Sequence, residues 1–298
     1  MIYILIACIF WGGDPIIRYP LVEGGISIQG LVFWEHVLMV LLVSPYIPGA
    51  ISIIRKDRQL LTLFILLGCI SSALATLTFT RAFTYLSPSL VILLQKLKTF
   101  TGLILAAWLL KEKPGREFYF WSGIAIIGAL LVSFPHIEAF LSEKAHHREK
   151  GAYAFIGYGL VGITILGWGG GTVLARMLME RGVKPMTLMA GRYGIGLGCL
   201  IPLVAQDVNL LPVSGDQAVK IFLMTLFSGY VAVRLFYKGL EKVNASITSI
   251  LELFSTLFAV SMSWIILDQP LTTIQIFGAA VLTGACFMST TQRTARNV

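Results

Sequence analysis

Apolar runs long enough to cross a bilayer, separated by short polar gaps, dominate this chain. A membrane-spanning helix needs about twenty mostly apolar residues. Windows of that kind begin at Met1, Ser27, Gln59, Pro88, Glu117, Gly151, Pro185, Gln217, Asn244 and Leu271. Prolines at the window starts fit this division, because a proline ring is tolerated in the first turn of a helix. The pattern predicts an all-α membrane protein with ten transmembrane helices.

The second half of the chain repeats the first. A tryptophan followed by glycines stands in the first span of each half, and the register of 157 residues extends to further pairs: Trp11 with Trp168, Glu23 with Glu180 and Gly25 with Gly182. A second block has a register of 156 residues: Trp108 with Trp264, Pro114 with Pro270, Gly128 with Gly284 and Glu112 with Asp268. Since five spans per half is an odd number, the second half enters the membrane from the opposite side. We therefore expect two inverted five-helix repeats at residues 1–135 and 151–290, a linker at 136–150 and a tail at 291–298.

Composition excludes most other classes of protein. Of the 298 residues 56% are hydrophobic and 13% charged, with a mean hydropathy of +0.82, whereas soluble domains carry about a quarter charged residues. The net charge of +8 does not indicate nucleic-acid binding, because most basic residues fall in the gaps between spans. Cys8, Cys69, Cys199 and Cys286 all lie in apolar runs without paired spacing. We expect free thiols there, and neither a disulfide framework nor a zinc cluster.

The distribution of Lys and Arg predicts the orientation. With a cytoplasmic N-terminus, the inner gaps hold thirteen basic residues: Arg55, Lys56, Arg58, Lys111, Lys113, Arg116, Arg176, Arg181, Lys184, Lys238, Lys242, Arg293 and Arg296. The outer gaps hold four: Arg81, Lys144, Arg148 and Lys150. The excess places both termini in the cytoplasm, with a periplasmic linker in an inner-membrane protein. The adjacent His146 and His147 of that linker lack further ligands at a set spacing, so we expect no metal site.

Ionisable residues inside the spans carry the functional signal. A charge at membrane depth is costly, and it usually faces a protein interior or a wet cavity. Asp14 and Arg18 lie four residues apart in the first span, on one helical face with Trp11. The other intramembrane candidates are Glu35, His36, Lys96, Lys98, Arg192, Arg234 and Glu252. We expect a polar cavity between the halves.

The repeat makes some of these charges equivalent and opposite in sign. Lys96 corresponds to Glu252, and Glu35 to Arg192. Such pairs could form gates or hold the two ends of a zwitterion; the alternative is buried ion pairs that only fix packing. Two residues along a helix turn a side chain by about 200°, so only one of Lys96 and Lys98 is expected to face the cavity. We favour Lys96, because its equivalent is also charged.

These considerations give two sets of candidate residues. The substrate-binding set is Trp11, Asp14, Arg18, Lys96, Trp168, Arg234, Tyr237 and Glu252. The coupling or gating set is Glu35, His36, Lys98 and Arg192. Trp11 and Trp168 are included because they lie in mid-span beside glycines, whereas interfacial belts account for many other aromatic residues.

Several short motifs resemble one known family. They are the Trp-Gly pair in the first span of each half, Arg192, the stretch Leu94-Gln95-Lys96-Leu97 leading to Leu110-Lys111-Glu112-Lys113, and Gly123 with Gly128. Together they resemble the EamA-type drug/metabolite transporter superfamily. The resemblance implies two inverted five-helix repeats, a cavity lined by spans one, three, four, six, eight and nine, and alternating access with export of small metabolites. The chain departs from that family at Glu35, where arginine is frequent, and at Thr99 and Ser255, where proline is usual.

The function expected from these features is secondary transport of a small polar metabolite, an amino acid or related zwitterion or organic anion. Nothing resembles an ATP-binding loop, and no cofactor is expected. A proton is the candidate coupling ion, through Asp14, Glu35, His36 or Glu252. A flippase of a lipid-linked substrate is the alternative on the same fold. A membrane-embedded enzyme is disfavoured, because His36 is the only histidine within a span. The expected partners are the substrate and the lipid bilayer, with the chain a monomer or homodimer.

Overall fold

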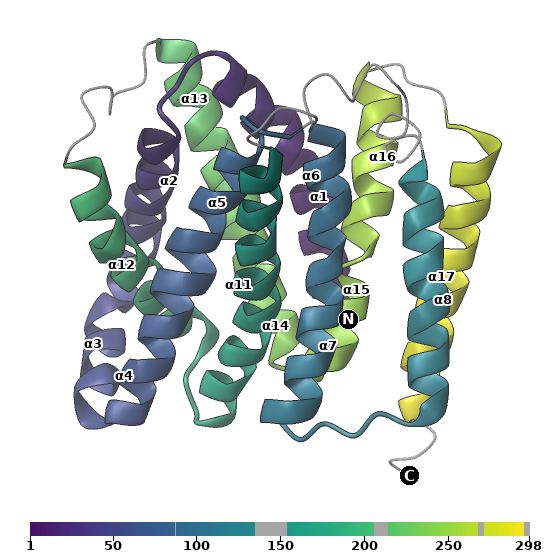
Figure 1. Cartoon of the computed structure of the whole chain (residues 1–298). Coiled ribbons are helices and arrows are strands. Elements are labelled where there is room, and N and C mark those ends of the chain that lie inside the picture. Colours follow the sequence, from purple (N-terminus) through teal and green to yellow (C-terminus); the bar gives the residue numbers. More distant parts are fainter. Residues whose placement is uncertain (87, 135–153, 206–213, 268–270, 295–298) are drawn as a thin grey trace.

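A computed structural model describes residues 1–86, 88–134, 154–205, 214–267 and 271–294. These residues form one bundle of helices (Figure 1). The first half contains α1 (Ile2–Glu23), α2 (Ile28–Val43), η1 (Ser44–Tyr46), α3 (Ile47–Lys56), α4 (Arg58–Ile65), η2 (Leu66–Leu74), α5 (Ala75–Ala82), α6 (Pro88–Leu94), η3 (Gln95–Leu97), α7 (Lys98–Leu109) and α8 (Arg116–Val132). The second contains α11 (Ala154–Glu180), α12 (Pro185–Val204), α13 (Gly215–Met224), η4 (Thr225–Val231), α14 (Ala232–Leu240), α15 (Ala245–Leu251), α16 (Phe254–Leu267) and α17 (Thr273–Thr294).

The expected all-α membrane fold is confirmed. Among the described residues, seven helical stretches are long and apolar enough to cross a membrane, and shorter apolar helices complete the bundle. In Figure 1, α1 runs upward whereas its repeat equivalent α11 begins at the top and runs downward. α8 and α17, the last spans of the two halves, are likewise antiparallel. The two halves therefore cross the bundle in opposite directions, as an inverted repeat requires.

Two equivalent turns show how closely the halves match. Gly25 and Gly182 have φ angles of +77° and +83°, a left-handed conformation that glycine adopts without strain. Each turn is closed by the same hydrogen bond, from Ile26 N–H to the Leu21 carbonyl and from Val183 N–H to the Leu178 carbonyl. Both are glycine caps at a helix C-terminus, following α1 and α11. The register of 157 residues thus holds at the level of single hydrogen bonds.

Several spans are interrupted where hydropathy predicts continuous helix. The π-helical segments η2 and η4 lie at equivalent places in spans three and eight. Span four contains the 3₁₀ turn η3, and span nine breaks at Glu252 and Leu253 between α15 and α16. Such interruptions are common at functional sites, because they turn side chains away from their regular helical positions.

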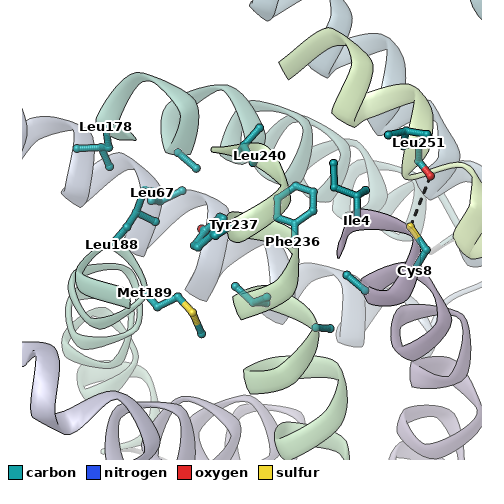
Figure 2. Packing of buried hydrophobic residues seen from close by; sticks show 14 of the residues in the cluster. Ile4, Cys8, Leu67, Leu178, Leu188, Met189, Phe236, Tyr237, Leu240 and Leu251 are labelled. Atoms are coloured by element: carbon teal, nitrogen blue, oxygen red, sulfur yellow. Dashed lines mark hydrogen bonds between the residues drawn. The ribbon is translucent and has the colours of Figure 1, made fainter. Parts of the chain in front are cut away.

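A tightly packed apolar cluster joins the last turns of α11 and α14 to the first turns of α1 and α12. Figure 2 shows its buried side chains: Ile4, Cys8, Leu67, Leu178, Leu188, Met189, Phe236, Tyr237, Leu240 and Leu251. Small residues allow the close approach, since a Cβ at Gly239 would lie 2.5 Å from Cγ1 of Ile4. In lipid, such van der Waals packing replaces the hydrophobic effect as the force that joins helices.

The expectation of four free thiols is wrong for two of them. Cys69 in η2 and Cys199 in α12 form a disulfide, with their Cα atoms 5.8 Å apart. They are 130 residues apart in the sequence, and only the packing of α12 against η2 brings them together. Cys8 and Cys286 are free and buried.

The helices α8 and α17 form a pair at the side of the bundle (Figure 1). They pack chiefly on each other, with fewer contacts to the remaining helices. A Cβ on Gly128 would lie 2.5 Å from the backbone nitrogen of Leu282, and one on Gly278 2.7 Å from Cβ of Leu131. Glycines therefore set the close spacing of this pair.

Candidate functional site

A cavity lies in the middle of the bundle between the two halves. It contains about 1100 Å³ of space free of protein atoms, including the part open to solvent. Its walls come from eight spans, represented in chain order by Trp11, Glu35, Phe79, Lys96, Trp168, Arg192, Phe236 and Glu252. All six spans that the family resemblance implied contribute, and spans two and seven add Glu35 and Arg192.

Most of the candidate residues from the sequence meet at this cavity. The ones that line it are Trp11, Asp14, Arg18, Glu35, Lys96, Lys98, Trp168, Arg192, Tyr237 and Glu252. Arg234 and His36 do not line it. Arg234 is exposed, because successive residues of α14 point about 100° apart and Val233 and Phe236 already face the cavity. His36 is 1% exposed and lies behind the wall.

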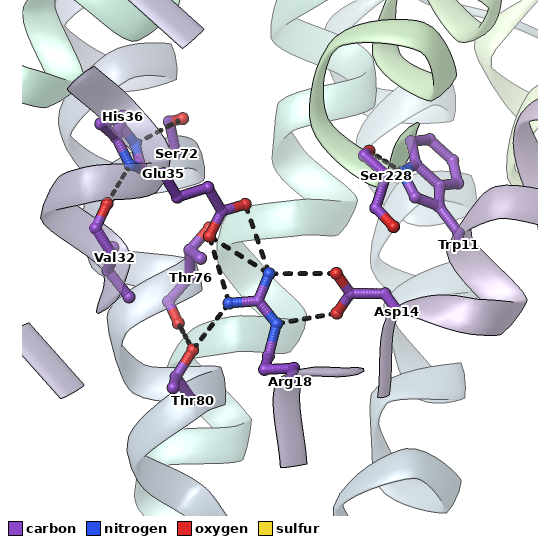
Figure 3. Close-up of polar contacts among 10 residues, drawn as sticks. All are labelled: Trp11, Asp14, Arg18, Val32, Glu35, His36, Ser72, Thr76, Thr80 and Ser228. Atoms are coloured by element: carbon purple, nitrogen blue, oxygen red, sulfur yellow. Dashed lines mark hydrogen bonds and ion pairs between the residues drawn. The ribbon is translucent and has the colours of Figure 1, made fainter. Parts of the chain in front are cut away.

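Arg18 connects two carboxylates at the cavity wall (Figure 3). Its Nε lies 2.7 Å from Oδ2 of Asp14, and its Nη1 lies 3.1 Å from Oε2 of Glu35. The guanidinium also donates to Oδ1 of Asp14 at 3.1 Å and to Oγ1 of Thr80 at 3.2 Å. These charge-assisted bonds hold the cluster rigidly. The partner of Glu35 is therefore Arg18, and not its repeat equivalent Arg192.

The His36 ring is held by its own surroundings (Figure 3). Its Nδ1 lies 2.9 Å from the carbonyl oxygen of Val32, and its Nε2 lies 3.1 Å from Oγ of Ser72. A carbonyl oxygen only accepts, so Nδ1 carries a proton. The ring of Tyr193 packs against the imidazole with centroids 5.5 Å apart. These contacts tie α2 to span three and span seven.

Lys98 and Glu252 form a second ion pair, between spans four and nine. Lys98 Nζ lies 2.6 Å from Oε2 of Glu252, and Thr172 Oγ1 donates to Oε1 of Glu252 at 3.1 Å. The same ammonium lies 5.4 Å from the ring centroid of Trp11 and 5.6 Å from that of Trp168. The equivalent tryptophans of the two halves thus flank one cation, in the geometry of cation–π contacts.

The expectation that only one of Lys96 and Lys98 reaches the cavity is wrong. Both line it, and Lys98 is the one paired with Glu252. The expectation assumed a regular α-helix, whereas the chain passes through the 3₁₀ turn η3 at Gln95–Leu97 before α7 begins at Lys98.

Two cations at the cavity lack a carboxylate partner in the described part of the chain. Lys96 has neither an ion pair nor a hydrogen bond there. Arg192 donates to the hydroxyl of Tyr237 at 2.8 Å and to the carbonyl of Ser71 at 3.3 Å, and its Nε has no hydrogen-bond partner among the residues that the structure describes. The lining cations are Arg18, Lys96, Lys98 and Arg192, and the lining carboxylates are Asp14, Glu35 and Glu252. With all seven groups ionised, the cavity has a formal charge of +1.

A symmetric aromatic arrangement was missed by sequence reasoning. Trp11 packs against Phe236 with centroids 5.0 Å apart, and Trp168 packs against Phe79 at 4.7 Å. Phe79 and Phe236 are themselves 157 residues apart, so each tryptophan meets the phenylalanine of the other half. The repeat register was the signal that identifies Phe79. Trp11 Nε1 also donates to the carbonyl of Ser228 at 3.0 Å, which joins α1 to η4 (Figure 3).

Comparisons with known proteins agree with this architecture. The model of the EamA-like transporter family matches residues 1–134 and 155–291. The riboflavin transporter ImpX of Fusobacterium nucleatum subsp. nucleatum is 24% identical over 291 residues, which covers 94% of this chain and 93% of that protein. A crystal structure of another protein has the same fold, with a TM-score of 0.78 at 10% identity over 97% of this chain and 95% of that one. The chain therefore belongs to the EamA-like transporter family and is a membrane transporter rather than an enzyme.

Proposed function

We propose that the protein is a secondary transporter for a small polar metabolite that carries an anionic group, an organic anion or a zwitterion such as an amino acid. The observation that carries the proposal is Lys96, whose ammonium group borders the cavity without an ion-pair partner among the described residues. A charge in that position is costly at membrane depth unless a partner of opposite sign arrives. The carboxylate or phosphate of a substrate is such a partner.

The other lining groups support the same class of substrate. The formal charge of +1 favours an anion over a cation. The rings of Trp11, Trp168, Phe79 and Phe236 supply apolar walls beside the cations. Binding sites for small molecules commonly combine apolar walls with a few placed polar groups. The substrate then has an apolar or planar part beside its charged group.

Alternating access is the mechanism we propose. The central site is built from both halves, and inverted-repeat carriers move one half against the other around such a site. Contacts between the halves are themselves symmetric, since α1 packs on α14 and α16 while α11 packs on α5 and α7. Exchange between the two arrangements would expose the cavity to each side in turn. The proposed direction of transport is export, which the family resemblance implies.

A proton is the proposed coupling ion. Arg18 is the one cation that forms ion pairs with Asp14 and Glu35 among the described residues, and the three groups carry a formal charge of −1 when ionised. One bound proton makes this cluster neutral. A buried cluster that changes its charge by a single proton is suited to link proton movement to a conformational change.

The proposed orientation has both termini in the cytoplasm of a cell with an inner membrane. The junction of α3 and α4, with Arg55, Lys56 and Arg58, lies at the lower end of Figure 1. The connection from α7 to α8 and the end of α17 lie at that same end. An excess of Lys and Arg on one side supports a cytoplasmic location for that side.

Riboflavin is a second candidate substrate. It is supported by the relative from Fusobacterium, which is named a riboflavin transporter, and by the four aromatic side chains of the cavity. A planar heterocycle stacks readily between aromatic rings. This candidate differs from the first in needing no substrate charge, and so the role of Lys96 separates the two.

Flux into sealed proteoliposomes tests the proposal. Labelled amino acids, dicarboxylates, organic phosphates and riboflavin are compared, together with flipping of a fluorescent lipid. We expect saturable flux of an anionic or zwitterionic solute, reduced at least tenfold by Lys96→Gln, because the unpaired cation is lost.

Lys220→Gln is the matched control, since Lys220 lies on the exposed face of α13 beside Asp216. Flux of riboflavin alone, unaffected by Lys96→Gln, would favour the second candidate. Lipid flipping without solute flux would refute both.

A further inference from the structure

A second hollow lies on the side of the bundle, between α7 and α8 and away from the central cavity. It contains about 940 Å³ of space, including the part open to its surroundings. No lining residue is shared with the central cavity. The α8–α17 pair packs chiefly on itself, which leaves this groove between α7 and α8.

The walls of the groove are apolar and outward-facing. Phe100, Ile104 and Trp108 line it from α7, and Tyr119 and Gly123 from α8. Ile104 is 65% exposed and Trp108 73% exposed. Residues of this kind on the outside of a membrane protein contact lipid, and Trp and Tyr favour the level of the headgroups. The groove is therefore shaped to take hydrocarbon chains.

One polar group inside the groove lacks a partner. Ser122 is 2% exposed and lines the groove, and its Oγ has no hydrogen-bond partner in the part of the chain that the structure describes. Because Ser122 is this deeply buried, bulk water does not supply the missing bond. Ser122 lies six residues into α8 from Arg116, or about 9 Å at the rise of an α-helix. That depth matches the boundary between headgroups and hydrocarbon, where lipid ester oxygens lie.

Exposed cations gather at the end of this groove. Lys111, Lys113 and Arg116 lie on the connection from α7 to α8. The neighbouring carboxylate of Glu112 is turned to α15, where it accepts from the backbone N–H groups of Ala245 and Ser246 at 2.9 and 3.1 Å. It therefore leaves the three cations uncompensated apart from the exposed Glu117. A phosphate group would complement this charge.

Lys111 has an unusual backbone conformation. Its φ angle is +53°, the left-handed region in which glycine is usual. The turn is closed by bonds from the N–H groups of Leu110 and Glu112 to the carbonyl of Ala106, both 3.2 Å long. A lysine at this position costs backbone energy and contributes a charge at the mouth of the groove.

We propose that the groove between α7 and α8 binds one anionic phospholipid of the adjoining leaflet. The phosphate lies against Lys111, Lys113 and Arg116, a glycerol ester oxygen accepts from Ser122, and an acyl chain follows Phe100, Ile104 and Trp108. The cations favour this occupant over a second copy of the chain, whose equivalent basic connection would repel them. The inference is independent of the proposed substrate.

Native mass spectrometry of the purified full chain tests this site. Phosphatidylglycerol and phosphatidylcholine with the same acyl chains are titrated separately. We expect one phosphatidylglycerol to bind at least tenfold more tightly than phosphatidylcholine, because each basic residue near the surface adds to the attraction. The variant Lys111→Asn/Lys113→Gln/Arg116→Gln should lose that preference; asparagine is used at 111 because it tolerates positive φ. The matched control is Arg55→Gln/Lys56→Gln/Arg58→Gln, three exposed cations at the same end of the bundle.

A second pair of variants tests the groove itself. A Cβ on Gly123 meets nothing within 4 Å and Gly123 lines the groove, so Gly123→Leu places a larger side chain inside it. Gly284→Leu on α17 is its control, since Gly284 is also open and exposed. Gly123→Leu should abolish the tight binding of phosphatidylglycerol, and Gly284→Leu should retain it.

Three results would overturn the proposal: equal binding of the two lipids, equal loss of binding in a test variant and its control, or retained binding in Gly123→Leu. Circular dichroism and gel filtration identify any variant that fails to fold, and Lys111→Gly, which relieves the backbone, then serves as the test.

Discussion

Lys98 and Glu252 form an ion pair across the two halves of the transporter, with 2.6 Å between Nζ and Oε2. The two residues come from spans four and nine, which are equivalent in the repeat. Side-chain exposure is 17% for Lys98 and 6% for Glu252, so the pair is largely shielded at the cavity wall. It fixes the distance between two elements that the proposed mechanism requires to move.

Removing one partner of this ion pair should destabilise the protein more than removing both partners. Lys98→Gln or Glu252→Gln leaves one buried charge alone, and we expect a loss of about 2 kcal/mol in the free energy of unfolding, less than for a fully buried pair because the cavity is partly open to solvent. The double variant should recover most of this loss. Thermal unfolding of the three variants in one detergent measures it. Additive losses in the double variant would mean that the two groups do not stabilise each other.

The Arg18 cluster should determine the response of transport to pH. Glu35→Gln removes one of the two carboxylates on Arg18, so Asp14 alone balances the guanidinium. We expect flux in this variant to become insensitive to an imposed pH gradient, because no proton is needed to neutralise the cluster. Glu23→Gln is the control, since Glu23 is an exposed carboxylate on the same helix. An unchanged pH response in Glu35→Gln would assign coupling to another residue.

The two tryptophans should contribute similarly to binding. Both rings lie near the Lys98 ammonium, and a cation–π contact is worth about 0.5–2 kcal/mol. We expect Trp11→Ala and Trp168→Ala each to raise the KM for transport by about twofold to thirtyfold. Trp→Phe at either position should restore part of the effect, because the ring face is kept. Flux at graded substrate concentrations measures KM, and unchanged KM in both alanine variants would remove the aromatic pair from the site.

The glycine turns after α1 and α11 should be equally intolerant of side chains. Gly25→Ala and Gly182→Ala force alanine into a left-handed conformation at a cost of about 1 kcal/mol. Both variants should therefore unfold at lower temperature by similar amounts. Gly13→Ala is the contrasting variant, because it lies within α1 where a Cβ meets open space, and it should not destabilise the protein. A destabilisation by Gly13→Ala equal to the other two would show that the turn conformation is not the cause.

The disulfide can be tested by counting the cysteines that react with an alkylating reagent. With Cys69 bound to Cys199, alkylation of the denatured chain without reductant should modify two cysteines, Cys8 and Cys286. After reduction, all four cysteines of the chain should react. Intact-mass spectrometry separates the two results. Four modifications without reductant would show that the thiols at 69 and 199 are not linked.

The sequence alone determined the helical membrane fold and its repeat. Ten apolar windows of spanning length admit few structures, because lipid offers the backbone no hydrogen bonds and only helices or closed barrels satisfy it internally. The repeat register located Gly25 and Gly182, and most of the ionisable positions within the spans line the cavity. Membrane-embedded charges are rare and costly enough to mark such a site without knowledge of contacts.

The tertiary structure determined which charged groups form ion pairs and which cysteines form the disulfide. Glu35 meets Arg18, Glu252 meets Lys98, and Cys69 meets Cys199. None of these choices follows from spacing, because they depend on how helices pack and on the breaks at η2, η3 and η4. The placement of Arg234 and His36 outside the cavity has the same origin. Hydropathy indicates which segments enter the membrane. The rotation of each helix about its axis is set by packing against its neighbours, and that rotation determines which polar groups meet.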